Sequence, residues 1–252
     1  MTRHEELVAM LKDLKLPGMA ACFADLATKA AKDGSTHEAF FYDVVRAECE
    51  QREQRRIDRF QHRSGLPAEK TFHTLRSERF SPLLQQQVER LRSGEFVTEA
   101  VNCIAVGKPG TGKSHLLAAV GHELISQGYA VRWYSTASLV QLLLAAKRDL
   151  ALPKLLASLD RFDLLVLDDI GYVQHDRDEM EVMFTLLADR YERRSIAITT
   201  NLVFSEWTRI FKDPMTTLAA IDRVVHHAVI LDLMAMESYR AEEAGRHANQ
   251  TP

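Results

Sequence analysis

A glycine-rich segment at residues 107–114 ends in a lysine and a serine that stand at a fixed spacing from its first glycine. Its sequence, GKPGTGKS, matches the pattern G-x-x-x-x-G-K-[ST] at every position and stands between an apolar run and a helical pattern. Glycines let backbone N–H groups converge on phosphate oxygens, and the N-terminus of the following helix adds positive potential. The segment therefore predicts an ATP site, in which Lys113 reaches the β- and γ-phosphates and Ser114 is a ligand of Mg²⁺. The expected cofactor-binding residues are Gly107, Lys108, Pro109, Gly110, Thr111, Gly112, Lys113, Ser114 and His115.

Two carboxylates follow an apolar run farther along the chain. The run LLVL, residues 164–167, ends in Asp168 and Asp169, and ligands of open α/β sheets bind at the carboxyl ends of the strands. We expect Asp168 to hold Mg²⁺ and Asp169 to orient or deprotonate the attacking water. The next apolar run ends in TTN, where Asn201 could position water or sense the γ-phosphate, or could simply form a turn.

Strand and helix patterns alternate after residue 101. Runs rich in apolar residues predict strands near 102–106, 129–135, 163–169, 195–201 and 228–233. Helical patterns stand between them, near 113–124, 138–150, 153–162, 179–191, 204–211 and 217–227. This alternation predicts a three-layer α/β fold, with a parallel sheet covered by helices on both faces.

The residues before this region read as helices. Apolar residues recur at helical spacing in three segments, and Ser35 with Glu38 has the spacing of a capping box at the start of the third. We therefore expect a helical N-terminal DNA- or partner-binding module at 1–66, linker helices at 67–95 and an ATPase domain at 96–252.

A stripe of arginines lies near the end of the third helical segment. Arg52, Arg56, Arg59 and Arg63 recur at spacings of four, three and four, which places them on one helical face. Such a stripe could follow the phosphates of DNA. It could equally be a solvated face stabilised by pairs such as Glu48 with Arg52.

The composition is that of an ordinary globular protein. Hydrophobic residues make up 46% of the 252 residues, charged residues 27%, and the net charge is −3, so a nucleic-acid surface would have to be a local patch. The first residues lack a secretory pattern and the longest apolar run is too short for a membrane helix, which favours a cytoplasmic protein without membrane contact. The three cysteines, Cys22, Cys49 and Cys103, are expected to be small core residues.

These motifs together resemble the AAA+ ATPases, and one branch closely. The phosphate loop, DRYERRS, TTNLVFSEW, AAIDRVVHHA, ESYR and the opening LKLPGMAACFADL resemble the IstB family of transposition helper ATPases, related to the DnaC helicase loaders. The resemblance covers nearly the whole chain. It implies an ATP-dependent homo-oligomer that assembles on duplex DNA, associates with the nucleoid, and recruits or stimulates an IstA-like transposase.

The resemblance also implies roles for residues outside the phosphate loop. Arg223 stands where this superfamily places an arginine finger that acts on a neighbouring subunit, and a surface salt bridge is the alternative. Arg190, Arg193 and Arg194 compete with Arg223 for such interface roles. Lys147 and Arg148 end the first of two helices that resemble a DNA-facing insertion, although they could merely cap that helix.

Several features leave alternatives open. Many AAA+ proteins carry Asp-Glu where this chain has Asp168-Asp169, and the shorter carboxylate predicts slow hydrolysis.

A DnaC-like helicase loader is the alternative function, because both families share the ATPase. A metabolic kinase would need a lid and a substrate pocket that the sequence does not indicate. His226 and His227 with Asp222 could suggest zinc, but helical packing is the favoured interpretation.

Overall fold

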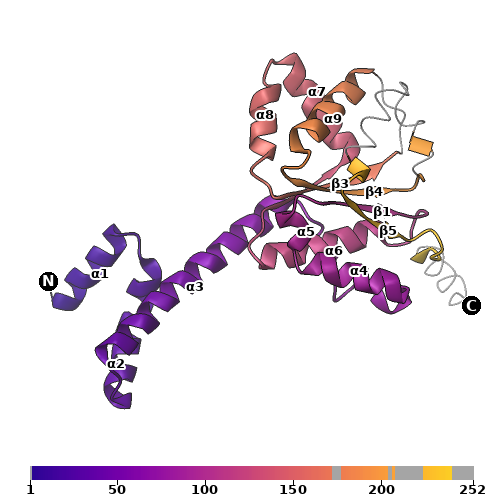
Figure 1. The fold of residues 1–252 in the computed structure, drawn as a ribbon. Helices are drawn as coiled ribbons and strands as arrows, with labels where there is room; N and C mark the ends of the chain where they lie inside the picture. The colour runs from indigo at the N-terminus through magenta and orange to yellow at the C-terminus, as the bar shows by residue number, and fades with distance from the viewer. Residues whose placement is uncertain (1, 172–176, 204–205, 208–223, 240–252) are drawn as a thin grey trace, which may run out of the picture. The chain divides into compact units, whose positions relative to one another are not determined.

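The computed structural model describes residues 2–171, 177–203, 206–207 and 224–239 (Figure 1). The chain divides into two compact units, Met1–Arg59 and Phe60–Pro252, and the helix α3 runs through the boundary between them. The segment 67–95, expected to hold linker helices, belongs to the second unit. The binding module expected at 1–66 and the ATPase domain expected at 96–252 are defined by function, and both stay predictions.

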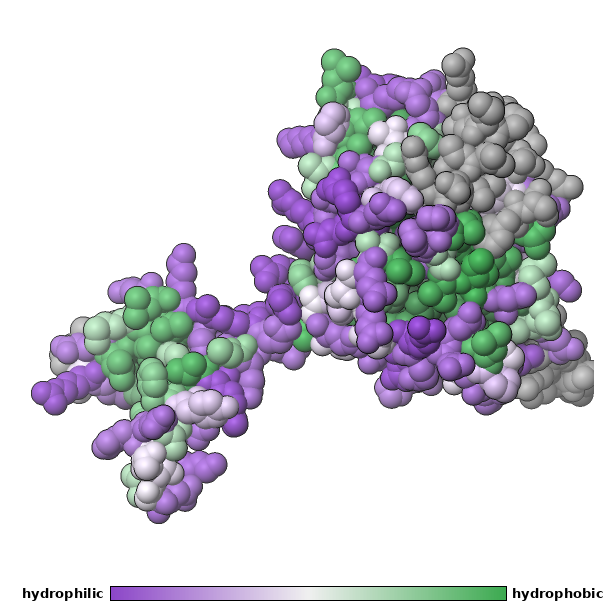
Figure 2. All heavy atoms as spheres, viewed as in Figure 1, coloured by the Kyte–Doolittle hydropathy of each residue, from purple (hydrophilic) through white to green (hydrophobic). Residues whose placement is uncertain are grey.

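The first unit consists of helices. They are α1 (Arg3–Asp13), α2 (Pro17–Asp33) and the part of α3 (His37–Ser64) that precedes Phe60. The capping box expected at Ser35 and Glu38 is wrong by one residue, because the hydroxyl of Thr36 accepts the amide of Ala39 and the helix begins at His37. Apolar residues gather on the surface of this unit (green in Figure 2). The large hydrophobic side chains exposed on it are Leu7, Met10, Leu14, Phe41 and Tyr42.

The carboxylate of Glu48 on α3 caps the N-terminus of α2. Its Oε2 accepts the amides of Gly18 at 2.6 Å and Met19 at 3.1 Å, while Oε1 pairs with Arg52 at 2.7 Å. Pro17 at the first helical position has no amide to satisfy. A side chain at Gly18 would lie 2.9 Å from the Cα of Glu48, so the close approach of the two helices requires glycine here.

The second unit is built on a five-stranded parallel sheet. The strands are β1 (Asn102–Val106), β2 (Val131–Ser135), β3 (Leu164–Ile170), β4 (Ser195–Thr200) and β5 (Ala228–Asp232), in the order β2-β3-β4-β1-β5. The side chains of the three central strands β1, β3 and β4 are buried, except for Asp168 and Asp169 on β3. Such near-continuous apolar runs are typical of a parallel sheet covered on both faces.

Helices cover both faces of this sheet (Figure 1). The short helix η1 (Ser77–Arg79) precedes α4 (Pro82–Arg92), which with α5 (Glu95–Thr98) and α6 (Lys113–Ser126) lies on one face. The other face carries α7 (Thr136–Arg148), α8 (Leu152–Leu159) and α9 (Arg177–Arg190). The expected three-layer α/β fold is therefore confirmed. The helices expected near 204–211 and 217–227 fall mostly outside the described residues.

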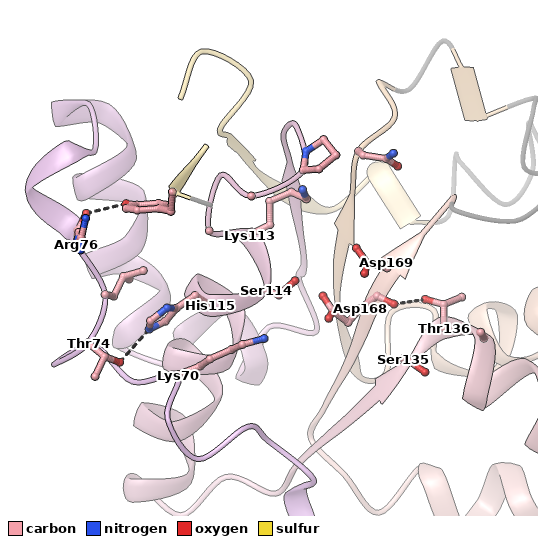
Figure 3. Close-up of a pocket in the computed structure, with 17 residues that line it drawn as sticks. Lys70, Thr74, Arg76, Lys113, Ser114, His115, Ser135, Thr136, Asp168 and Asp169 are labelled. Carbon is pink, nitrogen blue, oxygen red and sulfur yellow. Dashed lines mark hydrogen bonds between the residues drawn. The ribbon is translucent and has the colours of Figure 1, made fainter. Parts of the chain in front are cut away.

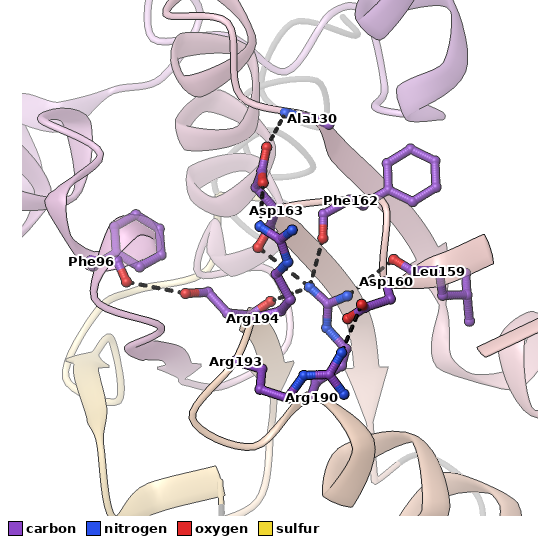
Figure 4. Close-up of polar contacts among 10 residues, drawn as sticks. Phe96, Ala130, Leu159, Asp160, Phe162, Asp163, Arg190, Arg193 and Arg194 are labelled. Carbon is purple, nitrogen blue, oxygen red and sulfur yellow. Dashed lines mark hydrogen bonds and ion pairs between the residues drawn. The ribbon is translucent and has the colours of Figure 1, made fainter. Parts of the chain in front are cut away.

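The guanidinium of Arg190, at the end of α9, lies inside the second unit (Figure 4). It donates to the carbonyl oxygens of Leu159, Phe162, Asp163 and Ser195 at 2.9–3.3 Å. Burial lowers the pKa of Arg190 to about 10. The expectation that Arg190 competes for an interface role is wrong, because the side chain is only 1% exposed and joins α9 to the strand ends around it.

Its neighbours Arg193 and Arg194 lie nearer the surface. Arg193 pairs with Asp160 at 2.8 Å and Arg194 pairs with Asp163 at 2.7 Å. These pairs hold the loop before β3 against the loop before β4.

The cysteines differ in their surroundings. Cys103 on β1 is buried, and burial raises the pKa of its thiol to about 12. Cys22 is half-buried and Cys49 on α3 is exposed, so the expectation that all three are core residues is wrong for Cys49. In the part of the chain that the structure describes, every helix is too short or too polar to cross a membrane.

Replacing Glu48 with glutamine should destabilise the first unit at neutral pH by about 1–3 kcal/mol, because charged hydrogen bonds to Gly18, Met19 and Arg52 are weakened. Burial raises the pKa of Glu48, but these hydrogen bonds outweigh it and hold the pKa below its usual value. The stabilisation is therefore present at neutral pH. It is lost as the pH falls from about 4.3, the pKa of glutamate in an unfolded chain, through the lowered pKa of Glu48 in the folded protein. Urea unfolding of both proteins between pH 7 and pH 3 measures the difference.

The matched control is Glu50→Gln, since Glu50 pairs with Arg46 on the exposed side of the same helix. We expect its effect to stay below about 0.5 kcal/mol. Amide exchange at Gly18 and Met19 locates the change. Equal stability of the Glu48 and Glu50 variants at pH 7 would rule out the capping role.

Replacing Arg190 with methionine should destabilise the second unit by about 3 kcal/mol or more, because several buried carbonyl groups lose their donor. That corresponds to a fall in Tm of roughly 10 °C. Arg193→Met is the control: its guanidinium is half exposed, and removing a surface pair costs about 1 kcal/mol or less. Calorimetry of the two variants makes the comparison, and similar Tm values would contradict a special role for Arg190.

Candidate nucleotide site

One cavity of about 640 Å³ opens at the carboxyl ends of the central strands (Figure 3). The phosphate loop and the start of α6 form one wall, and β3 with the start of α7 forms the opposite wall. The structure brings nine of the expected site residues into its lining: Pro109, Gly110, Gly112, Lys113, Ser114, His115, Asp168, Asp169 and Asn201. Residues from three separate stretches of sequence therefore face one space.

The loop after β1 wraps around its own lysine. Gly110 and Gly112 have φ angles of +82° and +94°, a region that favours glycine. The loop then enters α6 at Lys113, whose Nζ donates to the carbonyl oxygens of Gly107 at 2.8 Å and Lys108 at 3.0 Å. The ammonium group of Lys113 and the N-terminus of α6 can therefore both bind an anion in the cavity.

The remaining loop residues support this shape from outside the cavity lining. Thr111 is fully buried and its hydroxyl donates to the carbonyl of Lys108 at 2.9 Å. A Cβ at Gly107 would lie 2.8 Å from Oγ1 of Thr111 and 2.9 Å from Leu233, so a side chain cannot fit there. The expected cofactor-binding residues thus include some that contact the cavity and some that hold the loop.

The two carboxylates of β3 reach the cavity because the strand is irregular at that point. Leu167 pairs with Ile198 and Ile170 pairs with Thr200, so two residues of β3 oppose one residue of β4. This is a β-bulge. Asp169 has φ +60°, a left-handed conformation that aspartate adopts more readily than most residues. Regular alternation would have sent Asp168 and Asp169 to opposite faces of the sheet.

Several lining residues were missed by the sequence analysis. Lys70, Thr74, Leu75 and Arg76 come from the segment before η1, and Tyr239 comes from beyond β5. The ring of His115 joins this segment to α6, because its Nε2 lies 3.0 Å from the carbonyl of Thr71 and 3.1 Å from the hydroxyl of Thr74. Nothing in the local sequence marks Lys70, Thr74, Leu75 and Arg76, since none of these four belongs to a spaced motif.

Tyr239 is held against the phosphate loop from two directions. Its amide donates to the carbonyl of Gly110 at 2.9 Å, and its hydroxyl donates to the carbonyl of Arg76 at 3.1 Å. The guanidinium of Arg79 lies 4.5 Å from the ring centroid. Burial raises the pKa of Tyr239, which therefore stays neutral at physiological pH. The motif ESYR contains this residue, and that was the available signal.

The residues expected to bind DNA are not among those that line the cavity. Arg52, Arg56 and Arg59 line a shallow groove on the first unit together with Arg55. Arg52 pairs with Glu48 and Arg56 pairs with Glu53, as expected for a solvated helical face. Arg63, on the second unit, is exposed at the end of α3 and its carbonyl accepts a hydrogen bond from Arg132.

At the end of α7, Lys147 and Arg148 have different surroundings. Lys147 contacts Glu181 at 2.9 Å and Asp178 at 3.2 Å, both on α9, and these hydrogen bonds raise its pKa. Arg148 is exposed. The charge of Lys147 is therefore already matched by carboxylates that the sequence analysis did not consider.

Two further expectations concern the last third of the chain. Arg223, the expected arginine finger, and Asp222 lie outside the described residues. The expectation that His226 and His227 pack within a helix is wrong, because both are exposed in the turn before β5. Glu192 joins them, and the ligand atoms of the three side chains lie within 4.8 Å of one another.

Solved structures share the fold of the second unit. The AMPPCP-bound DnaA of Aquifex aeolicus superposes with a TM-score of 0.54 at 17% identity, over 74% of this chain and 57% of that chain. The crystal structure of DnaI gives a TM-score of 0.55 at 17% identity, over 67% of this chain and 95% of that chain. These likenesses concern the fold alone.

Sequence relatives match almost the whole chain. An insertion sequence protein of Sinorhizobium fredii (strain NBRC 101917 / NGR234) is 43% identical over 94% of this chain and 81% of its own length. The protein of insertion sequence IS21 from Pseudomonas aeruginosa is 33% identical over 94% of this chain and 89% of its own length. The family model of the IstB-like ATP binding proteins matches residues 9–247. The chain therefore belongs to the IstB-like ATP-binding protein family, and its second unit has the AAA+ fold.

Proposed function

We propose that this protein hydrolyses ATP slowly and uses the nucleotide to control its assembly on duplex target DNA, where it recruits or stimulates a transposase. The observation that carries the proposal is the single cavity in which the phosphate loop faces Asp168, Asp169 and Asn201. A cavity that only bound nucleotide would not need a second carboxylate beside the first. Membership of an insertion-sequence family supports the link to transposition.

Each residue has a proposed task in this cavity. Lys113 binds the β- and γ-phosphates, Asp169 orients or deprotonates the attacking water, and Asn201 senses the γ-phosphate. The hydroxyl of Ser114 and the carboxylate of Asp168 are hard oxygen ligands on facing walls, and they fit Mg²⁺. When bound, Mg²⁺ neutralises charge on the phosphates. The short side chain of Asp169 supports slow turnover.

The arginine groove of α3 is our proposed contact with the DNA backbone. Arg52, Arg55, Arg56 and Arg59 line it, and guanidinium groups suit phosphate oxygens. Two of these arginines pair with glutamates, so only part of their charge is available. We extend the proposal to Arg63 on the same helix and to Arg148 at the end of α7. Lys147 should contribute less, because it binds two carboxylates.

The proposed assembly needs contacts between chains. The exposed apolar side chains of the first unit, Leu7, Met10, Leu14, Phe41 and Tyr42, support a role for this unit in binding the transposase. Arg223 is the proposed arginine finger, which would complete the site of a neighbouring copy and make hydrolysis depend on oligomerisation.

Replacing Asp169 with asparagine should lower the hydrolysis rate by about 100-fold or more, because the base that activates water is lost. Asparagine has nearly the same size and also tolerates a positive φ, so the bulge and nucleotide binding should persist. Phosphate release and the affinity for a fluorescent ATP analogue measure the two properties separately. The control Lys113→Ala should lose nucleotide binding as well. Hydrolysis at the wild-type rate in Asp169→Asn would remove this residue from the mechanism.

Duplex DNA should bind cooperatively with ATP and weakly with ADP, and Lys113→Ala should lose the difference. Fluorescence anisotropy with duplex and single strands of equal length, at fixed salt, measures this preference. A double variant Arg55→Ala/Arg59→Ala should weaken binding and flatten its salt dependence, while Arg46→Ala on the same helix serves as the control. Preference for single strands, or binding only with a helicase present, would instead support the helicase-loader function.

A further inference from the structure

The β-bulge of β3 is closed by one side chain from the neighbouring strand. Thr199 on β4 is the single residue opposite Asp168 and Asp169, and its side chain is completely buried. Its Oγ1 lies 2.8 Å from the amide nitrogen of Asp169 and 2.6 Å from Oδ1 of Asp168. One hydroxyl therefore contacts the backbone of one aspartate and the carboxylate of the other.

The direction of both hydrogen bonds follows from the chemistry of the groups. The amide of Asp169 can only donate, so Oγ1 of Thr199 accepts from it through a lone pair. The carboxylate of Asp168 can only accept when ionised, so the hydroxyl hydrogen of Thr199 points to Oδ1. The hydroxyl has no other hydrogen to give. Its orientation is thereby determined, and so is the position of the oxygen that receives it.

We propose that Thr199 is a positioning residue for the metal ligand Asp168. By holding Oδ1, it fixes the rotation of the carboxylate, so that Asp168 would offer Oδ2 to Mg²⁺ and Ser114 would offer its hydroxyl. The same hydroxyl stabilises the bulge that brings Asp169 to the cavity. This inference rests on the proposed function, in which the chain binds ATP with Mg²⁺.

The hydroxyls of two nearby threonines, Thr136 and Thr200, contact only backbone groups. The hydroxyl of Thr136, at the start of α7, donates to the backbone carbonyl of Asp168 at 2.9 Å. That bond fixes the main chain and does not touch the carboxylate. Thr200, the next residue of β4, is equally buried, but its Oγ1 accepts the amide of Leu202 at 3.1 Å. Thr199 is thus distinguished by its contact with the side-chain carboxylate of Asp168.

The test is the affinity of the full chain for a fluorescent derivative of AMPPCP, measured once with saturating Mg²⁺ and once with EDTA. Thr199→Val keeps the shape of the side chain and removes the hydroxyl. Losing a group that orients a metal ligand costs about 10-fold or more in metal affinity. We expect Thr199→Val to bind the Mg²⁺-loaded analogue about 10-fold more weakly than wild type and to bind the metal-free analogue almost normally.

Two further variants separate the hydroxyl from the packing. Thr199→Ser keeps the hydroxyl and should retain most of the Mg²⁺ effect, whereas Thr199→Ala, which removes the same methyl group and the hydroxyl, should lose it. This pair also answers the question if Thr199→Val does not fold. Thr200→Val is the matched control on the same strand and should keep the Mg²⁺ effect.

The outcomes distinguish this inference from the proposed function. If wild-type protein binds the analogue equally well with and without Mg²⁺, the proposed metal site itself is wrong. If wild type shows the Mg²⁺ effect and the serine and alanine variants show it equally, only the positioning role of Thr199 is overturned. A loss in Thr200→Val as large as in Thr199→Val would also overturn it, because general packing of β4 would then be the cause.

Discussion

Parallel pairing of the strands is the constraint on which the rest of the second unit depends. Because β1, β3 and β4 all run in one direction, their carboxyl ends meet at one edge of the sheet. The phosphate loop leaves β1 there, Asp168 and Asp169 lie near the end of β3 there, and Asn201 follows β4. Buried apolar side chains along these strands fix the register, and the register fixes which polar residues face one another. The bulge in β3 is a local exception, and it brings carboxylates to the same edge.

Much of this arrangement could be predicted from the sequence, because its signals are contiguous. The residues GKPGTGKS form a loop whose glycines, lysine and serine lie within eight positions, and LLVLDD joins a strand to its carboxylates. Tyr239 and Arg76 could not be predicted in the same way. They meet across 163 positions of sequence, and only the fold brings them together beside Gly110. The β-bulge was equally hidden, since two adjacent aspartates give no sign that alternation stops between them.

Charged residues were harder to interpret than apolar ones. The pair of Glu48 with Arg52 follows from a spacing of four and was anticipated, but the same carboxylate also caps a helix 30 positions earlier. Arg190 resembles its surface neighbours in sequence and is nevertheless buried among carbonyl groups. Lys147 meets acids that are more than 30 positions away. A charge can be counted from the sequence, whereas its partner depends on tertiary contacts.

The place of β1 in the sheet links ligand binding to folding. Its hydrogen-bonding neighbours, β4 and β5, begin at Ser195 and Ala228, far along the chain from β1 itself. The loop that carries Lys113 can therefore take its final shape only after distant segments have paired. The unfolded chain lacks this shape. A nucleotide that binds this loop consequently acts on the whole domain. At a concentration 100 times its Kd, it would stabilise the folded state by about 2.7 kcal/mol. The concentration of nucleotide in the cell therefore affects the stability of the folded protein, and through it the lifetime of the protein.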